Sequence, residues 1–381
     1  MHNLNFVAVV AEFNPVTGGH RYLVKKAKEI TGLPVLAILS GNFVQRGEPA
    51  VIGKFDRAKL ALDIGADVVI ELPTVFALSS APDFAYGAIK WLSACKNIKY
   101  LIFGSECGDL KRLQKVADEV SLASNSTKIK SALKTGKSFA TSVLDGLTAE
   151  TQSVLKLPNN LLGVEYLKAI KSLDSHLVPI TISRKGAHGQ ADTENFFSSS
   201  AVRELLINGN YDSDQIIFDA KLHKPFLCVN NFEKPIKCAF VKASRKDLAK
   251  INGASEGIEN LLAKTLAEPK SLTEILDNTA CKRYGRAKLS RFAFCTLLDI
   301  KKTDLKLAKT ITPYFHILAV KDKKLLAPLA SGKAKLITKK ADTEKLSVGA
   351  KKIFNIDVLA TKLYAAVGGG INPNADFETK L

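Results

Sequence analysis

The chain has 381 residues, enough for two or three domains with a substantial core, and its 46% hydrophobic and 24% charged residues are ordinary for a globular protein. It has no run of 18 apolar residues and no basic start followed by an apolar segment. These features argue against a membrane-spanning or exported protein, so we expect a cytoplasmic protein that does not bind membranes.

The positive charge, +18 in total, is concentrated in the second half of the chain. Residues 1–215 carry 24 Lys and Arg against 21 Asp and Glu, whereas residues 216–381 carry 31 against 16. If the lysines reflected only a lysine-rich proteome, both halves of the chain would be equally basic. The asymmetry therefore predicts a catalytic domain, 1–215, followed by a smaller, basic, mainly helical domain, 216–381, that binds a polyanion. The six cysteines form no CxxC pair, and we expect no metal site.

The first element is a buried strand that leads into a helix through a glycine-containing loop. The strand at 7–10 is short, apolar and rich in β-branched residues, Asn14-Pro15 marks a turn, and Gly18-Gly19 allow a tight bend. A helical pattern follows over 20–31. The free N–H groups and the positive dipole end at such a helix start favour phosphate binding.

Strands and helices then alternate along the first half. Further strands are expected at 34–39, 67–72, 100–103 and 178–182, and helices at 54–64, 83–94 and 161–172. The alternation predicts an α/β fold with a Rossmann-like parallel sheet and right-handed crossovers. Ligands bind such sheets at the carboxyl ends of the strands, so His20, Asn42, Glu71 and Gly104 are expected to line one crevice.

Three further polar segments lie in the first half. Composition predicts a surface loop at 43–49. Asn160 stands where it could cap the helix at 161–172 or meet a ligand. Ser198-Ser199-Ser200 open another helix, with Arg203 one turn in, and this start is a second candidate phosphate cradle.

The second half has more helical pattern and more lysine. We expect a positively charged helix surface with an aromatic neighbour, Tyr314, the pairing that holds phosphates and stacks bases; a basic helix with no ligand is the alternative. The glycine-rich tail from Gly368 is expected to fray. The basic residues that we predict to bind the polyanion are Lys282, Arg283, Arg286, Lys288 and Arg291.

The loop before the first helix carries the tetrapeptide Thr17-Gly18-Gly19-His20. It is neither a P-loop nor a GxGxxG fingerprint. It resembles the (H/T)xGH signature of the nucleotidyltransferase superfamily, in which the motif binds ATP phosphates and stabilises charge during adenylyl transfer. Hydroxyl, imidazole and backbone N–H groups are the donors that such a transition state needs. The alternative is a turn with an incidental histidine, which the flanking strand and helix make less favourable.

Longer blocks make the resemblance specific, and together they are similar to the tRNA(Met) cytidine acetate ligase family. The resemblance weakens after residue 215, and one position departs from it, since the family usually has histidine where this chain has Thr17; this shifts catalytic weight onto His20. The blocks are EFNPVTGGH at 12–20, SGNFVQRGEP at 40–49, ELP at 71–73, FGSE at 103–106, PNNLLGVEY at 158–166 and RKGAH at 184–188.

The resemblance implies that ATP activates acetate to acetyl-adenylate and that the acetyl group passes to the wobble cytidine of elongator tRNA(Met), giving 4-acetylcytidine. Mg²⁺ is expected to arrive with ATP. A small-molecule adenylyltransferase would leave the basic half unexplained, and a non-catalytic RNA-binding protein would leave His20 unexplained. Thr17 and His20 are the predicted catalytic residues. The predicted nucleotide contacts are Val10, Ala11, Glu12, Phe13, Asn14, Pro15, Val16, Thr17, Gly18, Gly19, His20, Arg21, Tyr22, Leu23, Gly104, Asn159, Asn160, Arg184 and Lys185.

Overall fold

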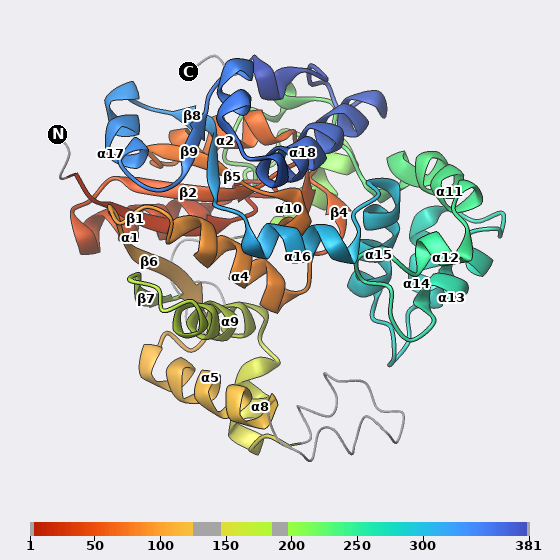
Figure 1. The fold of residues 1–381 in the computed structure, drawn as a ribbon, viewed down its shortest axis with the longest axis horizontal. Helices are drawn as coiled ribbons and strands as arrows, with labels where there is room; N and C mark the ends of the chain where they lie inside the picture. Colours follow the sequence, from red (N-terminus) through yellow and green to blue (C-terminus); the bar gives the residue numbers. More distant parts are fainter. Residues whose placement is uncertain (1–3, 125–145, 185–196, 379–381) are drawn as a thin grey trace.

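The computed structural model describes residues 4–124, 146–184 and 197–378. Within these ranges seven strands form one sheet in the order β7-β6-β1-β2-β5-β8-β9 (Figure 1). The strands of this sheet are β1 Phe6–Ala11, β2 Val35–Ser40, β5 Val68–Leu72, β6 Ile98–Ser105, β7 Val178–Ser183, β8 Tyr314–Val320 and β9 Lys335–Ile337. A separate antiparallel hairpin consists of β3 Phe43–Val44 and β4 Glu48–Pro49.

The five strands that the first half of the chain contributes to the seven-stranded sheet all pair in parallel. β1 lies between β2 and β6, β5 extends the sheet beyond β2, and β7 extends it beyond β6. β1, β2 and β5 are short, almost fully buried apolar runs, which suits parallel strands covered on both faces, whereas the edge strand β7 is partly exposed. The predicted α/β fold with a Rossmann-like parallel sheet is therefore confirmed.

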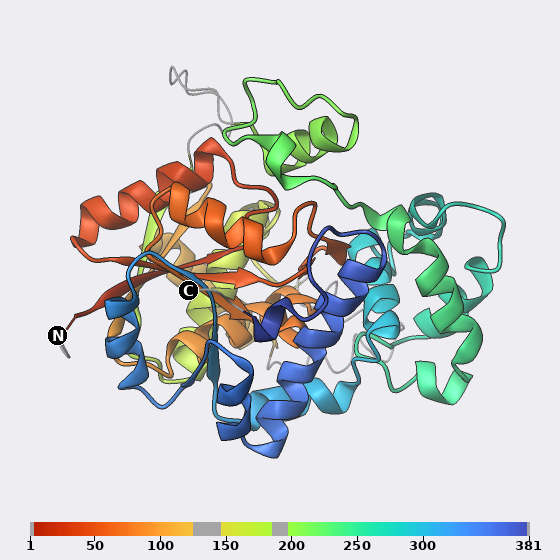
Figure 2. The same ribbon diagram turned by 90° about the horizontal axis from the view of Figure 1, so that it is seen from above.

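Helices cover both faces of the sheet, as the alternating side chains of β1 illustrate. Phe6 and Ala8 belong to one hydrophobic core together with Trp91 of α4, whereas Val7 and Val9 belong to a second core that includes Val24 of α1. Figure 2 shows the sheet between these two layers. The helices of the first half are α1 Gly18–Thr31, α2 Lys54–Asp63, α3 Thr74–Ala77, α4 Ala81–Leu92, α5 Leu110–Ser124, α8 Ala149–Leu155, α9 Pro158–Ser172 and α10 Ser199–Ile207.

The second half is mainly helical, but it also completes the sheet. β8 pairs antiparallel with β5, and β9 pairs parallel with β8. The predicted boundary near residue 215 thus does not separate the sheet from the basic half, because an apolar strand from that half covers the edge of β5. The helices of this half are α11 Glu233–Lys242, α12 Arg245–Leu248, α13 Ile258–Thr265, α14 Leu272–Thr279, α15 Arg286–Leu297, α16 Lys302–Thr310, α17 Leu326–Ala330 and α18 Val348–Ala366.

Helices α11 to α15 gather on one side of the molecule, away from α17 (Figure 1). Short 3₁₀ helices connect several elements of this half. They are Ala220–His223, Val229–Phe232, Lys323–Leu325, Lys340–Lys345 and Ala375–Phe377.

Three expectations about exposed segments are wrong. The segment 43–49 is mostly buried, with Phe43 packed on Phe232 and Phe294. Tyr314 is a buried residue of β8 that donates a hydrogen bond to Asp357, so it cannot stack on a base. The tail after Gly368 packs back onto the protein. In each case an apolar or charged partner from a distant part of the chain covers the segment, and local composition does not encode that partner.

No helix in the described ranges has the length and apolar character needed to cross a membrane.

Candidate active site

A cavity of about 470 Å³ opens at the carboxyl ends of β1, β6 and β7, against the start of α1. This volume is within the range of small-molecule sites. Predicted nucleotide contacts that line it are Val10, Ala11, Glu12, Phe13, Asn14, Thr17, Gly19, His20, Tyr22, Leu23, Gly104, Asn159 and Arg184.

Thr17 and His20 lie together at the start of α1. Thr17 is the residue before the helix, and its backbone N–H donates to His20 Nδ1 over 3.1 Å. The hydroxyl of Thr17 lies 3.1 Å from the same nitrogen. Because Nδ1 accepts the backbone N–H, neutral His20 carries its proton on Nε2. The pair therefore presents an imidazole N–H donor rather than a base.

His20 is held neutral by its surroundings. Burial and the nearby charge of Arg184 lower the pKa of His20 to about 4. The edge of its ring meets Phe13, with 5.0 Å between the ring centres. A fixed, uncharged donor beside a helix N-terminus suits an anionic ligand and a transition state in which negative charge develops.

The second predicted phosphate cradle lies on the same cavity. Ser198, Ser199, Ser200 and Arg203 of the α10 start all contribute to its lining. Arg203 donates to the carbonyl oxygen of Asn14 over 2.6 Å and to Ser200 Oγ over 3.0 Å. Two helix starts with hydroxyl and guanidinium donors therefore face one space, although 180 residues of sequence separate them.

Gly104, Asn159 and Arg184 also line the cavity. The Arg184 guanidinium donates to the side-chain oxygen of Asn159, and a methyl group added at Gly104 would lie 3.0 Å from Arg184 Cγ. Glu106 fixes the start of α9 by accepting the Asn159 side-chain N–H over 2.6 Å and the Asn160 backbone N–H over 2.8 Å. These contacts hold the polar groups of this part of the lining in place.

Several predicted contacts lie elsewhere. Asn160 is 1% exposed, and its side-chain oxygen accepts the backbone N–H groups of Glu106 and Cys107, so it supports the neighbouring loop. Lys185 lies outside the described residues. The predicted contacts that are not among the lining residues are Pro15, Val16, Gly18, Arg21 and Asn160.

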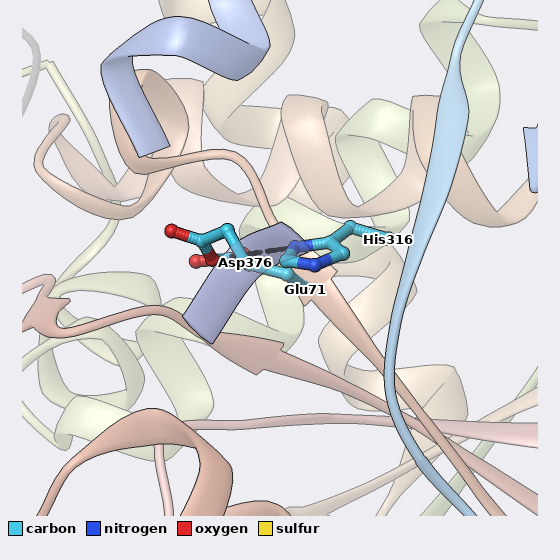
Figure 3. A group of neighbouring side chains, drawn as sticks. All are labelled: Glu71, His316 and Asp376. Atoms are coloured by element: carbon cyan, nitrogen blue, oxygen red, sulfur yellow. Dashed lines mark hydrogen bonds and ion pairs between the residues drawn. The ribbon is translucent and has the colours of Figure 1, made fainter. Parts of the chain in front are cut away.

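Asn42 and Glu71, expected in the same crevice, are instead buried away from it. Asn42 accepts the backbone N–H of Lys54 over 3.0 Å. Glu71 lies beside His316 and Asp376, and Figure 3 shows the three side chains directed toward one another. Their ligand atoms lie within 4.8 Å of one another.

This triad already holds a cation. Lys54 Nζ lies 2.8 Å from both Glu71 oxygens and 2.5 Å from the Asp376 carboxylate. Burial alone would lower the pKa of Lys54, but the charges of Asp376 and Glu71 outweigh it and raise this pKa above its ordinary value. An ammonium group therefore stands where a metal ion would bind, and we assign the group to structure.

The sequence reasoning missed one wall of the cavity. This wall includes Gln45 and Arg46 from the β3–β4 hairpin, Phe84 from α4, Phe103 from β6 and Tyr166 from α9. Single apolar residues on helices and strands look like core residues in a sequence. A useful signal was present for the hairpin, because the block at 40–49 is long and distinctive.

The predicted tRNA-binding patch is largely engaged in internal contacts. Arg286 pairs with Glu48 over 2.9 Å and also contacts Asp277, and Arg291 donates to the Gln45 carbonyl over 3.0 Å. Arg283 and Lys288 both lie near Glu256, at 3.9 and 3.5 Å. Among the described residues no ion pair involves Lys282, which is exposed. Four of the five predicted cations thus make contacts within the protein.

Comparisons with known proteins agree with this geometry. Residues 4–376 match the HIGH Nucleotidyl Transferase family, so fold and site together define a nucleotidyltransferase. A tRNA(Met) cytidine acetate ligase of Clostridium perfringens is 30% identical, with 98% of each chain covered. The same enzyme of Caldanaerobacter subterraneus is 33% identical, with 94% of each chain covered.

Solved structures give the same result. The apo crystal structure of Thermotoga maritima TmcAL superposes with a TM-score of 0.87 at 28% identity, and the form bound with alpha-thio ATP gives 0.86, each with 98% of both chains covered. The chain belongs to the tRNA(Met) cytidine acetate ligase family. This confirms the predicted family and the predicted class of ATP-using ligase, and it does not favour the two rival classes.

Proposed function

We propose that this protein activates acetate with ATP and transfers the acetyl group to the wobble cytidine of elongator tRNA(Met). The observation that carries the proposal is the Thr17–His20 pair at the start of α1, which presents a neutral N–H donor to a cavity lined by a second cradle at α10. The family, whose Thermotoga maritima member has been solved with an ATP analogue, supports the same conclusion.

The cavity suggests how ATP would lie. Gly104 would let the base or ribose approach the backbone, and Arg184, beside Asn159, would be a donor to a phosphate group. The triphosphate would then reach the start of α1 and the hydroxyl groups of the α10 start, with Arg203 as a further donor. His20 and Thr17 would stabilise the charge that develops as acetate attacks the α-phosphorus.

No covalent intermediate on the protein is needed, because acetyl-adenylate is itself the activated species. Mg²⁺ would travel with the ATP phosphates. Among the described lining residues Glu12 is the one carboxylate, which is fewer than a dedicated protein cage for a divalent cation would supply. The metal would therefore be held mainly by the nucleotide and by water.

The tRNA surface is best sought among the exposed cations on helices α11 and α12. Lys234, Lys242, Arg245 and Lys246 are exposed, and within the described ranges none of them forms an ion pair. Lys282 has the same properties. Arg286 and Arg291, in contrast, hold the β3–β4 hairpin, so changing them would disturb the cavity as well as any RNA contact.

Two measurements on the wild-type protein test the chemistry. Acetate should stimulate exchange of labelled pyrophosphate into ATP, and mass spectrometry of tRNA nucleosides from a deletion strain should show loss of 4-acetylcytidine. A protein that exchanges pyrophosphate without acetate, or a deletion strain with normal 4-acetylcytidine, would overturn the proposal.

Two triple charge-reversal variants, one on the proposed tRNA surface and one elsewhere, test this surface. We expect Lys234→Glu, Lys242→Glu and Lys246→Glu combined to abolish tRNA acetylation and leave pyrophosphate exchange intact. The matched control reverses Lys321, Lys323 and Lys324, exposed residues near α17 on the other side of the molecule (Figure 1). Each phosphate contact should contribute about −0.7 to −0.9 to the slope of log affinity against log salt. Equal loss in both triple variants would show that total charge, rather than this surface, governs binding.

A further inference from the structure

The two steps of the proposed reaction differ in their need for a base. Acetate attacks ATP as a carboxylate, so the first step releases pyrophosphate without removing a proton from the nucleophile. The second step joins an exocyclic amine to the acetyl carbonyl, and that nitrogen must lose a proton to become an amide. A proton acceptor near the reacting atoms is therefore useful in the second step alone.

Few groups on the cavity wall can accept that proton. The guanidinium groups of Arg46, Arg184 and Arg203 stay charged, and the phenol of Tyr166 stays protonated because burial and the charge of Glu12 raise its pKa. His20 is a weak base, since its pKa is lowered to about 4 and its Nδ1 already accepts the Thr17 N–H. Among the described lining residues Glu12 carries the one carboxylate.

The surroundings of Glu12 suit this task. It directly follows β1, and its Oε1 accepts the backbone N–H of Gln45 over 2.8 Å, whereas no donor in the described ranges bonds its Oε2. Burial raises the pKa of Glu12, and the Gln45 hydrogen bond and the charges of Arg46, Arg203 and Arg57 offset only part of that rise. The carboxylate is thus fixed by one oxygen and more basic than an exposed glutamate.

We propose that Glu12 is the general base of acetyl transfer. The inference rests on the proposed function. N4 of the cytidine attacks the acetyl carbonyl carbon, the N4–C bond forms, and the bond from that carbon to the phosphate oxygen breaks. AMP leaves with the bonding electron pair, and the N4 proton passes to Glu12 and from there to solvent. The products are the acetylated amine and AMP, with one proton released.

Contacts of the hairpin place Glu12 on the side of the cavity that faces the basic half. Gln45, whose N–H holds Glu12, is itself held through its carbonyl by Arg291 of α15. Ser290 of the same helix donates to the Gly47 carbonyl, and Arg286 pairs with Glu48. Glu12 is therefore linked through the β3–β4 hairpin to α15, on which α11 of the proposed tRNA surface packs through Phe240 and Phe292.

The test measures the two half-reactions separately in the variant Glu12→Gln. The amide oxygen of glutamine can still accept the Gln45 N–H, so the variant keeps the structural contact and loses the base. We expect normal melting, and single-turnover transfer from preformed acetyl-adenylate to tRNA that is slowed by about 10²–10⁴-fold more than acetate-dependent pyrophosphate exchange. The matched control is Glu165→Gln, which changes a buried glutamate of α9 that does not line the cavity.

A pH profile gives a second readout that a structural role would not produce. In the wild type, single-turnover transfer should rise with pH as Glu12 loses its proton and then level off, and this rise should vanish in Glu12→Gln. Unchanged transfer in the variant would overturn the inference, and so would equal loss of exchange and transfer. A wild-type protein that makes no acetyl-adenylate would instead overturn the proposed function itself, so the two failures are distinguishable.

Discussion

Lys54→Met tests the assignment of the buried charge cluster to structure. Lys54 and Asp376 are 0% exposed and Glu71 is 1% exposed, and the ammonium group lies between the two carboxylates. Methionine has nearly the same length and no charge, so the substitution leaves little cavity. It leaves two carboxylates close together with no cation between them, a more costly arrangement than the loss of a surface ion pair.

The expected size follows from the burial. Removing one partner of a buried ion pair costs about 3–5 kcal/mol. Unfolding entropy near 60 °C is about 2.1 cal/mol/K per residue, or about 0.8 kcal/mol/K for 381 residues, so this cost lowers the melting temperature by about 4–6 °C. The triple variant Lys54→Met, Glu71→Gln, Asp376→Asn should recover part of the loss, because it also removes the charges left unpaired.

Calorimetric or circular-dichroism melts at neutral pH measure the effect. The control is Lys59→Met, which removes a lysine that is 71% exposed and pairs with Asp56 over 3.3 Å on the surface. Exposed changes of this kind stay within about 0.5 kcal/mol, so its melting temperature should shift by less than about 1 °C. If Lys54→Met and the control Lys59→Met had the same melting temperature, the cluster would not be a stabilising ion network. A triple variant less stable than Lys54→Met would also contradict the charge argument.

His20→Ala should melt like the wild type and lose about 10²–10³-fold in acetate-dependent pyrophosphate exchange, because it removes one donor to the developing charge; exchange at the wild-type rate would refute the role. Asp357→Asn should gain stability relative to the wild type as the pH rises from about 4 to about 8. Burial and the charge of Glu71 raise the Asp357 pKa to about 8, so the stabilisation from its bound proton, complete below the ordinary Asp pKa, is lost as pH rises through this range. Parallel melting curves for both proteins across that range would contradict the shift. Gly47→Ala should destabilise by about 1–3 kcal/mol, since Gly47 has φ +77° and an added methyl would lie 2.4 Å from the Arg291 backbone nitrogen; an unchanged melting temperature would show that the hairpin moves freely.

Local pattern was enough to predict the core of the fold. The strand at 7–10, the glycine-containing loop and the helix over 20–31 correspond to β1 and α1, and the other four predicted strands are all present. Short apolar runs and amphipathic repeats encode burial directly, so alternation of the two predicts a parallel sheet. The same reasoning placed His20 and Gly104 on one cavity, because parallel strands end at the same edge of the sheet.

Partners that are distant in sequence were decided by the tertiary structure. Arg286 and Arg291 looked like free cations on a helix, yet their charges are engaged by Glu48 and by the carbonyl of Gln45. Tyr314 looked like an exposed aromatic and lies in a strand that extends the sheet. A sequence shows that a residue is charged or aromatic, but what it contacts depends on which surfaces meet.

Glu12 shows the same difference between what the sequence predicts and what the tertiary structure decides. The sequence placed Glu12 directly after a buried strand, at the edge where ligands bind. Its hydrogen bond to Gln45, its neighbours Arg46 and Tyr166, and the cost of burying its charge arise only when the hairpin and α9 close around it. Periodicity determines which side of an element is buried, whereas the basicity of a carboxylate depends on the dielectric and the charges that the assembled fold brings to it.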